Sequence, residues 1–283
     1  MQLRIILCTL LVSITCHCAT SQIFYRLSEF GISGGSSAYF GDLNDNYGFK
    51  FPRYSGGIFY KYNASPYIAI KLGGTYAHIG YSDKFSNNFY QKMRNLDFQS
   101  DIYEGAVSAE FHFFRYEIGE FDYRFTPYVT VGAGIFYYNP YTFLNGKKYF
   151  LRPLGTEGQN FEEYKNRRYG KTAVAFPIGA GIKFWFAKGV TIYLEVANRS
   201  TTTDYLDDVS TTYIGKENFI DPLPSPYPLP VEQLQDRSYE VTNNPIGIKG
   251  RQRGVNTTRD KYMTMQLGIS FRLPTYKCPS NIR

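Results

Sequence analysis

The sequence predicts an all-β fold: an eight-stranded antiparallel β-barrel that spans an outer membrane and has a filled interior. Three observations carry this prediction. A short apolar leader opens the chain, eight later segments alternate apolar with small or polar residues, and 18% of the 283 residues are aromatic. Beyond the leader, no apolar run reaches the roughly 20 residues that a membrane-spanning helix needs, so strands are expected to cross the bilayer.

The leader has the features of a secretory signal peptide. Residues 1–4 are short and basic, and residues 5–14 form an apolar run that is too short to span a bilayer. The small residues Ala19 and Ser21 precede Gln22, as a signal peptidase requires. We therefore expect a signal peptide over residues 1–21 and a single barrel domain over residues 22–283.

Period-two alternation predicts the eight strands. It is clearest in residues 172–186, where every even position from Val174 to Phe186 is apolar, and in residues 261–273, where every odd position from Met263 to Leu273 is apolar. An even number of strands suits a closed antiparallel barrel. In chain order, the expected strands are residues 25–35, 56–62, 67–81, 98–113, 126–138, 172–186, 190–201 and 261–273.

The second face of these strands distinguishes a membrane barrel from a soluble sandwich, which would expose many Lys, Glu and Thr side chains there. Here that face is rich in small residues such as Gly132, Gly179 and Gly181, which suit the crowded interior of a narrow barrel. Its charges nearly balance, so we expect them to pair with one another inside the barrel. They are the acids Glu29, Glu104, Glu110 and Glu195 and the bases Lys61, Lys71, Lys183, Arg199 and Arg272.

The first face of each strand is expected to contact outer-membrane lipids. In residues 190–201, for example, Ile192, Leu194 and Val196 would contact lipid, whereas Tyr193 and Glu195 would lie inside. Aromatic residues occur near the strand ends, where membrane proteins carry aromatic girdles. They include Tyr60, Tyr62, Tyr137, Tyr138, Phe184 and Phe186.

The connections between strands fall into two sets. Barrels of this kind place short turns and both termini in the periplasm and long loops outside the cell. We therefore expect the acidic motif of Asp204, Tyr205, Asp207 and Asp208 to lie in solvent at the outer rim, and the proline-rich residues 222–230 to be extended. The short connections are residues 63–66, 115–125 and 187–189, and the long ones are residues 36–55, 82–97, 139–171 and 202–260.

We expect neither enzymatic activity nor a bound cofactor, metal or nucleic acid. After the leader only His78 and His112 remain, and no spacing ties either histidine to a serine and a carboxylate. The three aspartates of the acidic motif lack the calcium-loop pattern Asp-x-Asp-x-Asp-Gly, which favours a solvated cluster. The formal charge of +7 comes from scattered Lys and Arg rather than from the stripe that nucleic acid needs. A barrel of eight strands has room only for side chains, which argues against a pore.

Five segments resemble the PorG-like family, the outer-membrane barrel component of the type IX secretion system. They are YFGDLND (39–45), RNLDFQSDIYE (94–104), TPYVTVGAGIFYYNP (126–140), LRPLGTEGQ (151–159) and TDYLDDVSTTY (203–213). The resemblance runs from about residue 29 to residue 213 and resumes in the final strand. Residues 214–260 depart from it because they are longer and richer in proline than the family pattern.

The resemblance implies a structural role. Such proteins tie a periplasmic ring, built of a lipoprotein and a soluble partner, to the outer membrane. The ring supports the export of cargo that carries a C-terminal signal and, in some bacteria, gliding motility. The residues themselves leave two alternatives open: a general surface barrel or adhesin that acts through its external loops, and a lipid-modifying barrel enzyme.

Cys278 is the only cysteine that remains after the leader. In an oxidising compartment, a lone cysteine is either a free thiol or an intermolecular link. We expect Cys278 to form a disulfide with a periplasmic partner, with the ring lipoprotein implied by the resemblance as the first candidate. A free thiol in a short polar tail is the alternative, and the motif does not decide between them.

Overall fold

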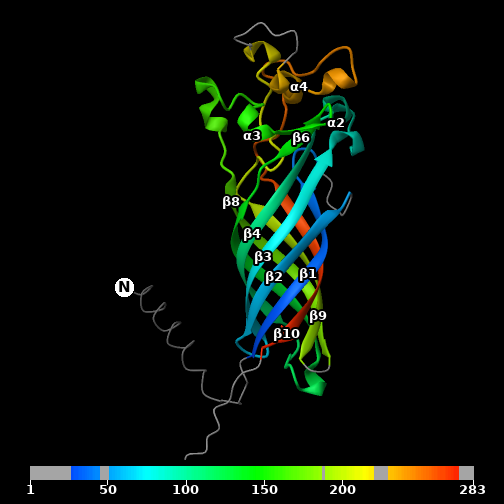
Figure 1. Cartoon of the computed structure of the whole chain (residues 1–283), viewed down its shortest axis with the longest axis vertical. Coiled ribbons are helices and arrows are strands. Elements are labelled where there is room, and N and C mark those ends of the chain that lie inside the picture. Colours follow the sequence, from blue (N-terminus) through cyan, green and yellow to red (C-terminus); the bar gives the residue numbers. More distant parts are fainter. Residues whose placement is uncertain (1–26, 45–50, 187–188, 220–228, 274–283) are drawn as a thin grey trace, which may run out of the picture.

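The protein forms a closed barrel of eight antiparallel strands in the computed structural model, which describes residues 27–44, 51–186, 189–219 and 229–273 (Figure 1). Each barrel strand pairs with the next along the chain, and the last pairs with the first. The predicted fold class, an eight-stranded antiparallel barrel of the outer-membrane type with a filled interior, is confirmed. The strands are β1 (Leu27–Phe40), β2 (Arg53–Asn63), β3 (Ile68–Ser82), β4 (Asp97–His112), β5 (Phe125–Tyr137), β8 (Thr172–Phe186), β9 (Val190–Thr201) and β10 (Lys261–Arg272).

All eight predicted strands are present, but β1 continues to Phe40, beyond its predicted end at residue 35. Ala38, Tyr39 and Phe40 are all buried, so the alternation stops although the strand continues. It stops because this part of β1 is covered on both faces. The predicted signal peptide (residues 1–21), most of the proline-rich run and Cys278 lie outside the described residues.

The two ends of the barrel differ (Figure 1). The short-turn end carries residues 64–67 and residues 113–124, which contain η2 (Phe121–Tyr123). The long-loop end carries a folded layer, called the cap here, made of the described parts of residues 41–52, 83–96, 138–171 and 202–260. Its short elements are η1 (Asp83–Phe85), α2 (Phe89–Arg94), β6 (Tyr141–Leu144), β7 (Lys147–Phe150), α3 (Leu151–Leu154), η3 (Glu162–Arg167), η4 (Lys216–Asn218), α4 (Pro230–Gln235) and η5 (Ser238–Glu240).

The hairpin of β6 and β7 lies in a segment that the sequence prediction treated as loop. Its turn is Asn145-Gly146, with φ of 51° and 78°. Two consecutive residues with positive φ are what a two-residue hairpin turn needs, and Asn-Gly is its commonest sequence. The hairpin joins the barrel sheet through the pairing of Gln99 with Tyr141.

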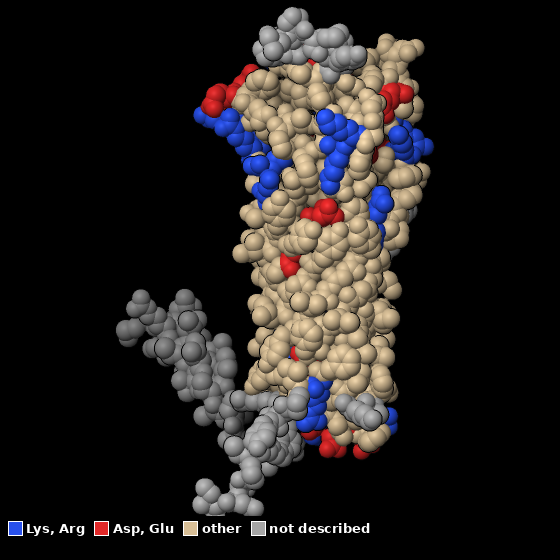
Figure 2. Space-filling view, viewed as in Figure 1, with Lys and Arg blue, Asp and Glu red and all other residues tan. Residues whose placement is uncertain are grey.

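Outward-facing side chains form a continuous apolar band around the barrel. On the face seen in Figure 2, the lower middle of the molecule is almost free of charged side chains, whereas Lys, Arg, Asp and Glu gather toward its two ends. An exposed apolar surface of this extent is costly in water and marks a contact with lipid or protein. Exposed members of the band include Ile58, Leu72, Val107, Val131, Ile135, Ile178 and Leu267. No helix within the described residues is long and apolar enough to cross a membrane.

The predicted aromatic girdle needs one correction. Tyr60, Tyr137, Phe184 and Phe186 are exposed, as lipid-facing residues should be, but Tyr138 is buried. Tyr138 follows the last residue of β5, so its ring turns into the apolar core beneath the cap.

Candidate functional site: the sealed lumen and the cap

Glu110 of β4 occupies the centre of an ion-pair network inside the barrel. Its Oε1 lies 2.9 Å from Lys61 Nζ and 3.8 Å from Lys71 Nζ, and its Oε2 lies 3.0 Å from Lys183 Nζ. These lysines come from β2, β3 and β8, so one carboxylate links four strands across the interior. Such close pairing is needed here because an unpaired charge in a dry interior would be strongly destabilising.

Two further carboxylates pair in the same interior. Glu195 accepts hydrogen bonds from Lys71 Nζ at 2.8 Å and from the Tyr128 hydroxyl at 2.9 Å. Glu104 accepts a hydrogen bond from Arg199 Nε at 2.9 Å. The Tyr262 hydroxyl also donates to Glu104, at 2.6 Å.

Glu29 and Arg272 differ from the other predicted members of the network. Glu29 is buried, but its described partners are Asn63 Nδ2 at 2.6 Å and Ser270 Oγ at 2.5 Å rather than a cation. Arg272 was predicted inside and is exposed. It is the last residue of β10, so its side chain lies where the barrel opens to solvent. Without it, the predicted interior set contains four acids and four bases, and its formal charges cancel.

The lumen is packed rather than open. A cavity of about 40 Å³ lies among its charged groups, lined by Lys71, Glu104, Glu195 and Arg199. That volume holds one or a few water molecules. The interior is therefore a polar core that joins the strands.

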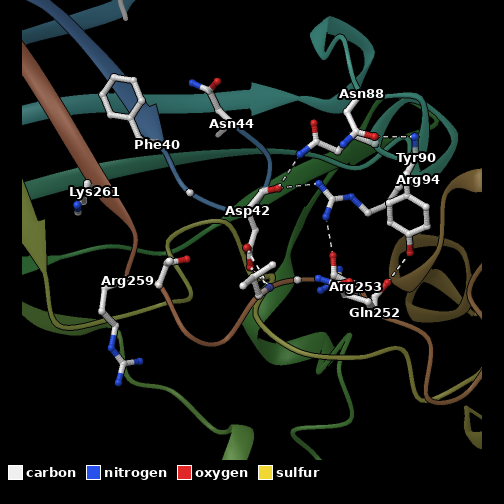
Figure 3. A pocket seen from close by; sticks show the side chains of 15 residues that line it. Phe40, Asp42, Asn44, Asn88, Tyr90, Arg94, Gln252, Arg253, Arg259 and Lys261 are labelled. Atoms are coloured by element: carbon white, nitrogen blue, oxygen red, sulfur yellow. Dashed lines mark hydrogen bonds between the residues drawn. The ribbon is translucent and has the colours of Figure 1, made fainter. Parts of the chain in front are cut away.

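In the cap, Arg94 connects segments that are far apart along the chain (Figure 3). Its Nε and Nη2 donate to the two carboxylate oxygens of Asp83 at 2.7 and 2.8 Å. Its Nη1 donates to the carbonyl oxygen of Arg253 at 2.5 Å, and its Nη2 also donates to that of Asp42 at 3.0 Å. Every polar contact of this buried guanidinium therefore fixes the position of a loop.

Glu157 is the second anchor of the cap and is fully buried. It accepts a hydrogen bond from Arg253 Nη1 at 3.1 Å. It also accepts bonds from the backbone nitrogen of Ser210 at 2.9 Å and from the Thr211 hydroxyl at 2.6 Å. A buried carboxylate that meets an arginine and several N–H or O–H donors is well compensated for its loss of water.

The acidic motif is buried, which corrects its predicted position in solvent. Asp204, Asp207 and Asp208 are 3%, 1% and 0% exposed. Asp204 accepts a bond from Ser210 Oγ at 2.6 Å, Asp207 accepts one from the Tyr39 hydroxyl at 2.6 Å, and Asp208 accepts bonds from the hydroxyls of Thr156 and Tyr169. The segment before β10 covers them, since Arg253 donates to the carbonyl oxygen of Asp208. Tyr205 stays partly exposed, with its ring stacked on Tyr169 at 4.5 Å.

Burial raises the pKa of five aspartates in and beside the cap: Asp42, Asp204, Asp207, Asp208 and Asp260. It raises the pKa of both Asp204 and Asp208 to about 6. Burial and the charge of nearby Asp204 raise the pKa of Asp42 to about 7. Burial, followed by the negative charge of Asp42, places the pKa of Asp207 well above its ordinary range, and burial followed by Asp207 does the same for Asp260. The cap therefore contains several acids that release their protons only near or above neutral pH.

A cleft of about 520 Å³ runs beside these anchors, lined in part by Asp42, Asn88, Tyr90, Arg94 and Gln252 (Figure 3). Several polar groups that line the cleft form hydrogen bonds with one another. The Tyr90 hydroxyl donates to the carbonyl oxygen of Gln252 at 2.5 Å, and the Tyr90 backbone nitrogen donates to Asn88 Oδ1 at 2.8 Å. The cleft thus lies at the boundary between cap segments that contact each other.

The described histidines do not form a catalytic arrangement. His112 lies 2.6 Å from Lys183 Nζ through Nε2 and 3.0 Å from the Pro66 carbonyl oxygen through Nδ1. His78 pairs with Asp101 at 2.8 Å, and the nearby Ser37 hydroxyl donates to the backbone carbonyl of His78 rather than to its ring. No group of three or more His, Cys, Asp or Glu within the described residues is arranged to hold a metal ion.

Sequence reasoning missed the cap anchors Arg94, Glu157 and Arg253. Arg94 and Glu157 stand inside the segments that carry the family resemblance, and this was the signal that could have marked them. Arg253 lies in the stretch that departs from the family pattern, and its local sequence carries no comparable signal.

Residues 5–219 match the family described as "Domain of unknown function (DUF6089)". The chain belongs to this family. The DUF6089 match ends before α4 and β10, so Arg253 lies beyond it. No curated protein matches this DUF6089 chain.

Among solved structures, this DUF6089 barrel is similar to Neisserial surface protein A (NspA), with 10% identity over 87% of this chain and 97% of that chain and a TM-score of 0.41. It is also similar to Ail of Yersinia pestis, with 12% identity, coverage of 88% and 100%, and a TM-score of 0.39. The N-terminal barrel domain of Pseudomonas aeruginosa OprF shows 11% identity, coverage of 88% and 100%, and a TM-score of 0.35.

Proposed function

We propose that this protein is a non-enzymatic outer-membrane barrel that anchors a periplasmic ring complex of the type IX secretion system. Its partners are outer-membrane lipids, the ring lipoprotein and the soluble partner of that lipoprotein. The barrel lies with the cap outside the cell and both termini in the periplasm, and it supports protein export and, in some bacteria, gliding motility.

One observation carries the proposal: segments that resemble the PorG-like family meet in the cap. Asp42, Arg94, Glu157 and Asp208 come from four of these segments, and they are joined by direct bonds or through Arg253. Sequence segments that share a family pattern and also share one buried network are expected to belong to one structural unit. This supports a common architecture with the PorG-like barrels.

The sealed lumen favours a role that acts through surfaces. The interior charges are paired, apart from the hydrogen-bonded Glu29, and the cavity among them is small, so the barrel offers no route for a solute. The cap adds a layer of bonded loops over one end. These features favour a function in which the ends of the barrel bind partner proteins.

The proposal is tested by affinity purification of the tagged protein from membranes in mild detergent. A periplasmic lipoprotein and its soluble partner should co-purify, and deletion of the gene should stop the export of cargo with a C-terminal signal. Recovery of the barrel without these partners, together with normal export in the deletion strain, would reject the anchoring role.

A general surface barrel or adhesin is the second candidate, and one observation favours it. The cap exposes large aromatic side chains, with Phe89 78% exposed and Phe143 43% exposed. In that case, Phe89→Ser should weaken attachment to surfaces and leave cargo export unchanged. Under the anchoring role, the same substitution should leave attachment unchanged.

A further inference from the structure

A cavity of about 710 Å³ lies at the short-turn end, at the edge of the apolar band. Much of its wall is aromatic and includes Tyr67, Phe113, Phe125 and Phe184. Phe125 of β5 and Phe184 of β8 pair directly on the outer face of the sheet and are 45% and 42% exposed. The cavity is therefore open on its outer side and continuous with the lipid-facing surface.

The same cavity presents a cation and an anion that do not pair. Arg124 donates through Nε to the carbonyl oxygen of Phe121 at 2.9 Å, and its guanidinium lies over the Phe121 ring at 4.2 Å. Neither Arg124 nor Asp122 forms an ion pair with any residue that the structure describes, although both line the cavity. The neighbouring Arg115, in contrast, is already paired with Glu117 at 2.8 Å.

We propose that this cavity binds the headgroup of a zwitterionic glycerophospholipid that carries a primary amine. The phosphate accepts hydrogen bonds from Arg124, since a guanidinium is well suited to phosphate oxygens. The ammonium donates to Asp122, and an acyl chain lies along Phe125 and Phe184 toward the apolar band. One positive and one negative protein group thus match the two charges of one headgroup.

Position and charge favour a lipid over a soluble ligand or a protein. The cavity lies where the apolar band ends, which is the level at which headgroups meet aromatic side chains. Asp122 disfavours headgroups that carry only negative charge, such as phosphatidylglycerol. A trimethylated amine, as in phosphatidylcholine, has no N–H to donate to the carboxylate. The inference rests on the membrane placement proposed above and is independent of the secretion role.

Trp185 provides a reporter for this cavity. It is the only tryptophan in the sequence, and its ring lies 5.7 Å from the Phe121 ring and 6.0 Å from the Arg124 guanidinium. Purified protein in maltoside micelles is titrated with phosphatidylethanolamine, phosphatidylglycerol or phosphatidylcholine. Trp185 emission reports binding, and native mass spectrometry counts the lipids that each barrel retains.

The wild-type protein should bind phosphatidylethanolamine about tenfold more tightly than the other two lipids, which is the order expected for one charge-assisted hydrogen bond. Arg124→Gln should weaken binding of all three lipids, whereas Asp122→Asn should make phosphatidylethanolamine and phosphatidylglycerol equivalent. Lys165→Gln, a control at the far end of the molecule, should behave as wild type. Heat-modifiable gel mobility verifies that each barrel is folded.

Equal binding of the three lipids by the wild-type protein would overturn the proposal without any substitution. Identical retention in Arg124→Gln and Lys165→Gln would overturn it as well. Arg124→Lys provides a second variant if Arg124→Gln does not fold: it keeps the charge and should retain part of the binding. Cargo export is measured separately, so failure here is distinguishable from failure of the anchoring role.

Discussion

Asp208→Asn should make the cap less sensitive to pH. Asp208 is fully buried and accepts hydrogen bonds from Thr156 and Tyr169, and burial raises its pKa from the ordinary value of 3.8 to about 6. The folded cap therefore holds this proton more tightly than the unfolded segment does. The stabilisation is complete below pH 3.8 and is lost as the pH rises through about 6.

The size of the effect follows from the difference between the two pKa values. At roughly 1.4 kcal/mol per pKa unit, it corresponds to about 3 kcal/mol, or about a hundredfold change in the population of the opened cap. Asparagine suits the backbone at this position, because Asp208 has a φ of 65° and Asn is among the residues that tolerate that region best. Its side-chain amide can still bond to both hydroxyls, but it does not titrate.

Limited proteolysis within residues 229–260 measures this effect in detergent-solubilised protein at pH 5 and pH 8, with each rate divided by that of a denatured substrate at the same pH. Because part of the stabilisation is already lost at pH 5, this window captures about 1.4 kcal/mol, or about a tenfold change. The wild-type cap should become markedly easier to cleave at pH 8. The increase should be smaller in Asp208→Asn, although Asp42 and Asp204 still contribute their own pH dependence. Equal increases in both proteins, or a wild-type cap that is better protected at pH 8, would refute the reasoning.

Four further predictions concern the barrel and the tail. Glu110→Gln should cost about 3–5 kcal/mol in urea unfolding followed by Trp185 fluorescence, because it leaves the buried Lys61 and Lys183 without an anion, whereas Lys71 keeps Glu195. Adding Lys183→Met should recover part of that cost, and a double variant as unstable as the sum of the single variants would contradict the pairing. Gly181→Leu should lower the free energy of unfolding by about 1–3 kcal/mol or more, because a Cβ there would lie 2.5 Å from the Leu194 carbonyl oxygen and 2.7 Å from Tyr128 Cζ. The control Gly105→Leu should be tolerated, because a Cβ at Gly105 has nothing within 4 Å, and equal stability of the two variants would count against the assigned faces. The purified protein should show no steady conductance in planar bilayers, and porin-sized currents would disprove a sealed lumen. Non-reducing gels of outer membranes should show a larger band that collapses with reductant and is absent in Cys278→Ser, and a monomer band in every lane would leave Cys278 as a free thiol.

The barrel could be predicted from the sequence because its signal is local. In β8 and β10, alternation over a dozen or more residues fixed both the strand and its two faces, and the balanced charges on the inner face indicated pairing. Arg272 shows the limit of this reasoning. The odd or even position of a residue in a strand predicts whether its side chain points into or out of the barrel. Whether that side chain is buried depends also on where the barrel wall ends, and the sequence of one strand does not show this.

The cap could not be predicted from the sequence because its contacts are long-range. Asp207 and Asp208 are expected to be solvated from their local composition, but they are buried by segments far from them in the chain. Tyr39 contacts Asp207 from 168 positions earlier, and Arg253 contacts Asp208 from 45 positions later. Arg94 contacts Arg253 across 159 positions. The β6–β7 hairpin is different, because its Asn145-Gly146 turn is a local signal that the sequence itself carries.

The seam between β1 and β10 has a consequence for how the protein is made. Ser270 of β10 bonds to Glu29 of β1 across 241 positions, so the ring of strands closes only when the end of the chain arrives. Until then the molecule is an open sheet with two unpaired edges, each able to pair with a neighbouring chain. The cell must therefore shield nearly the whole polypeptide during its delivery, and a chain that stops before Lys261 should be lost to aggregation rather than inserted as a smaller barrel.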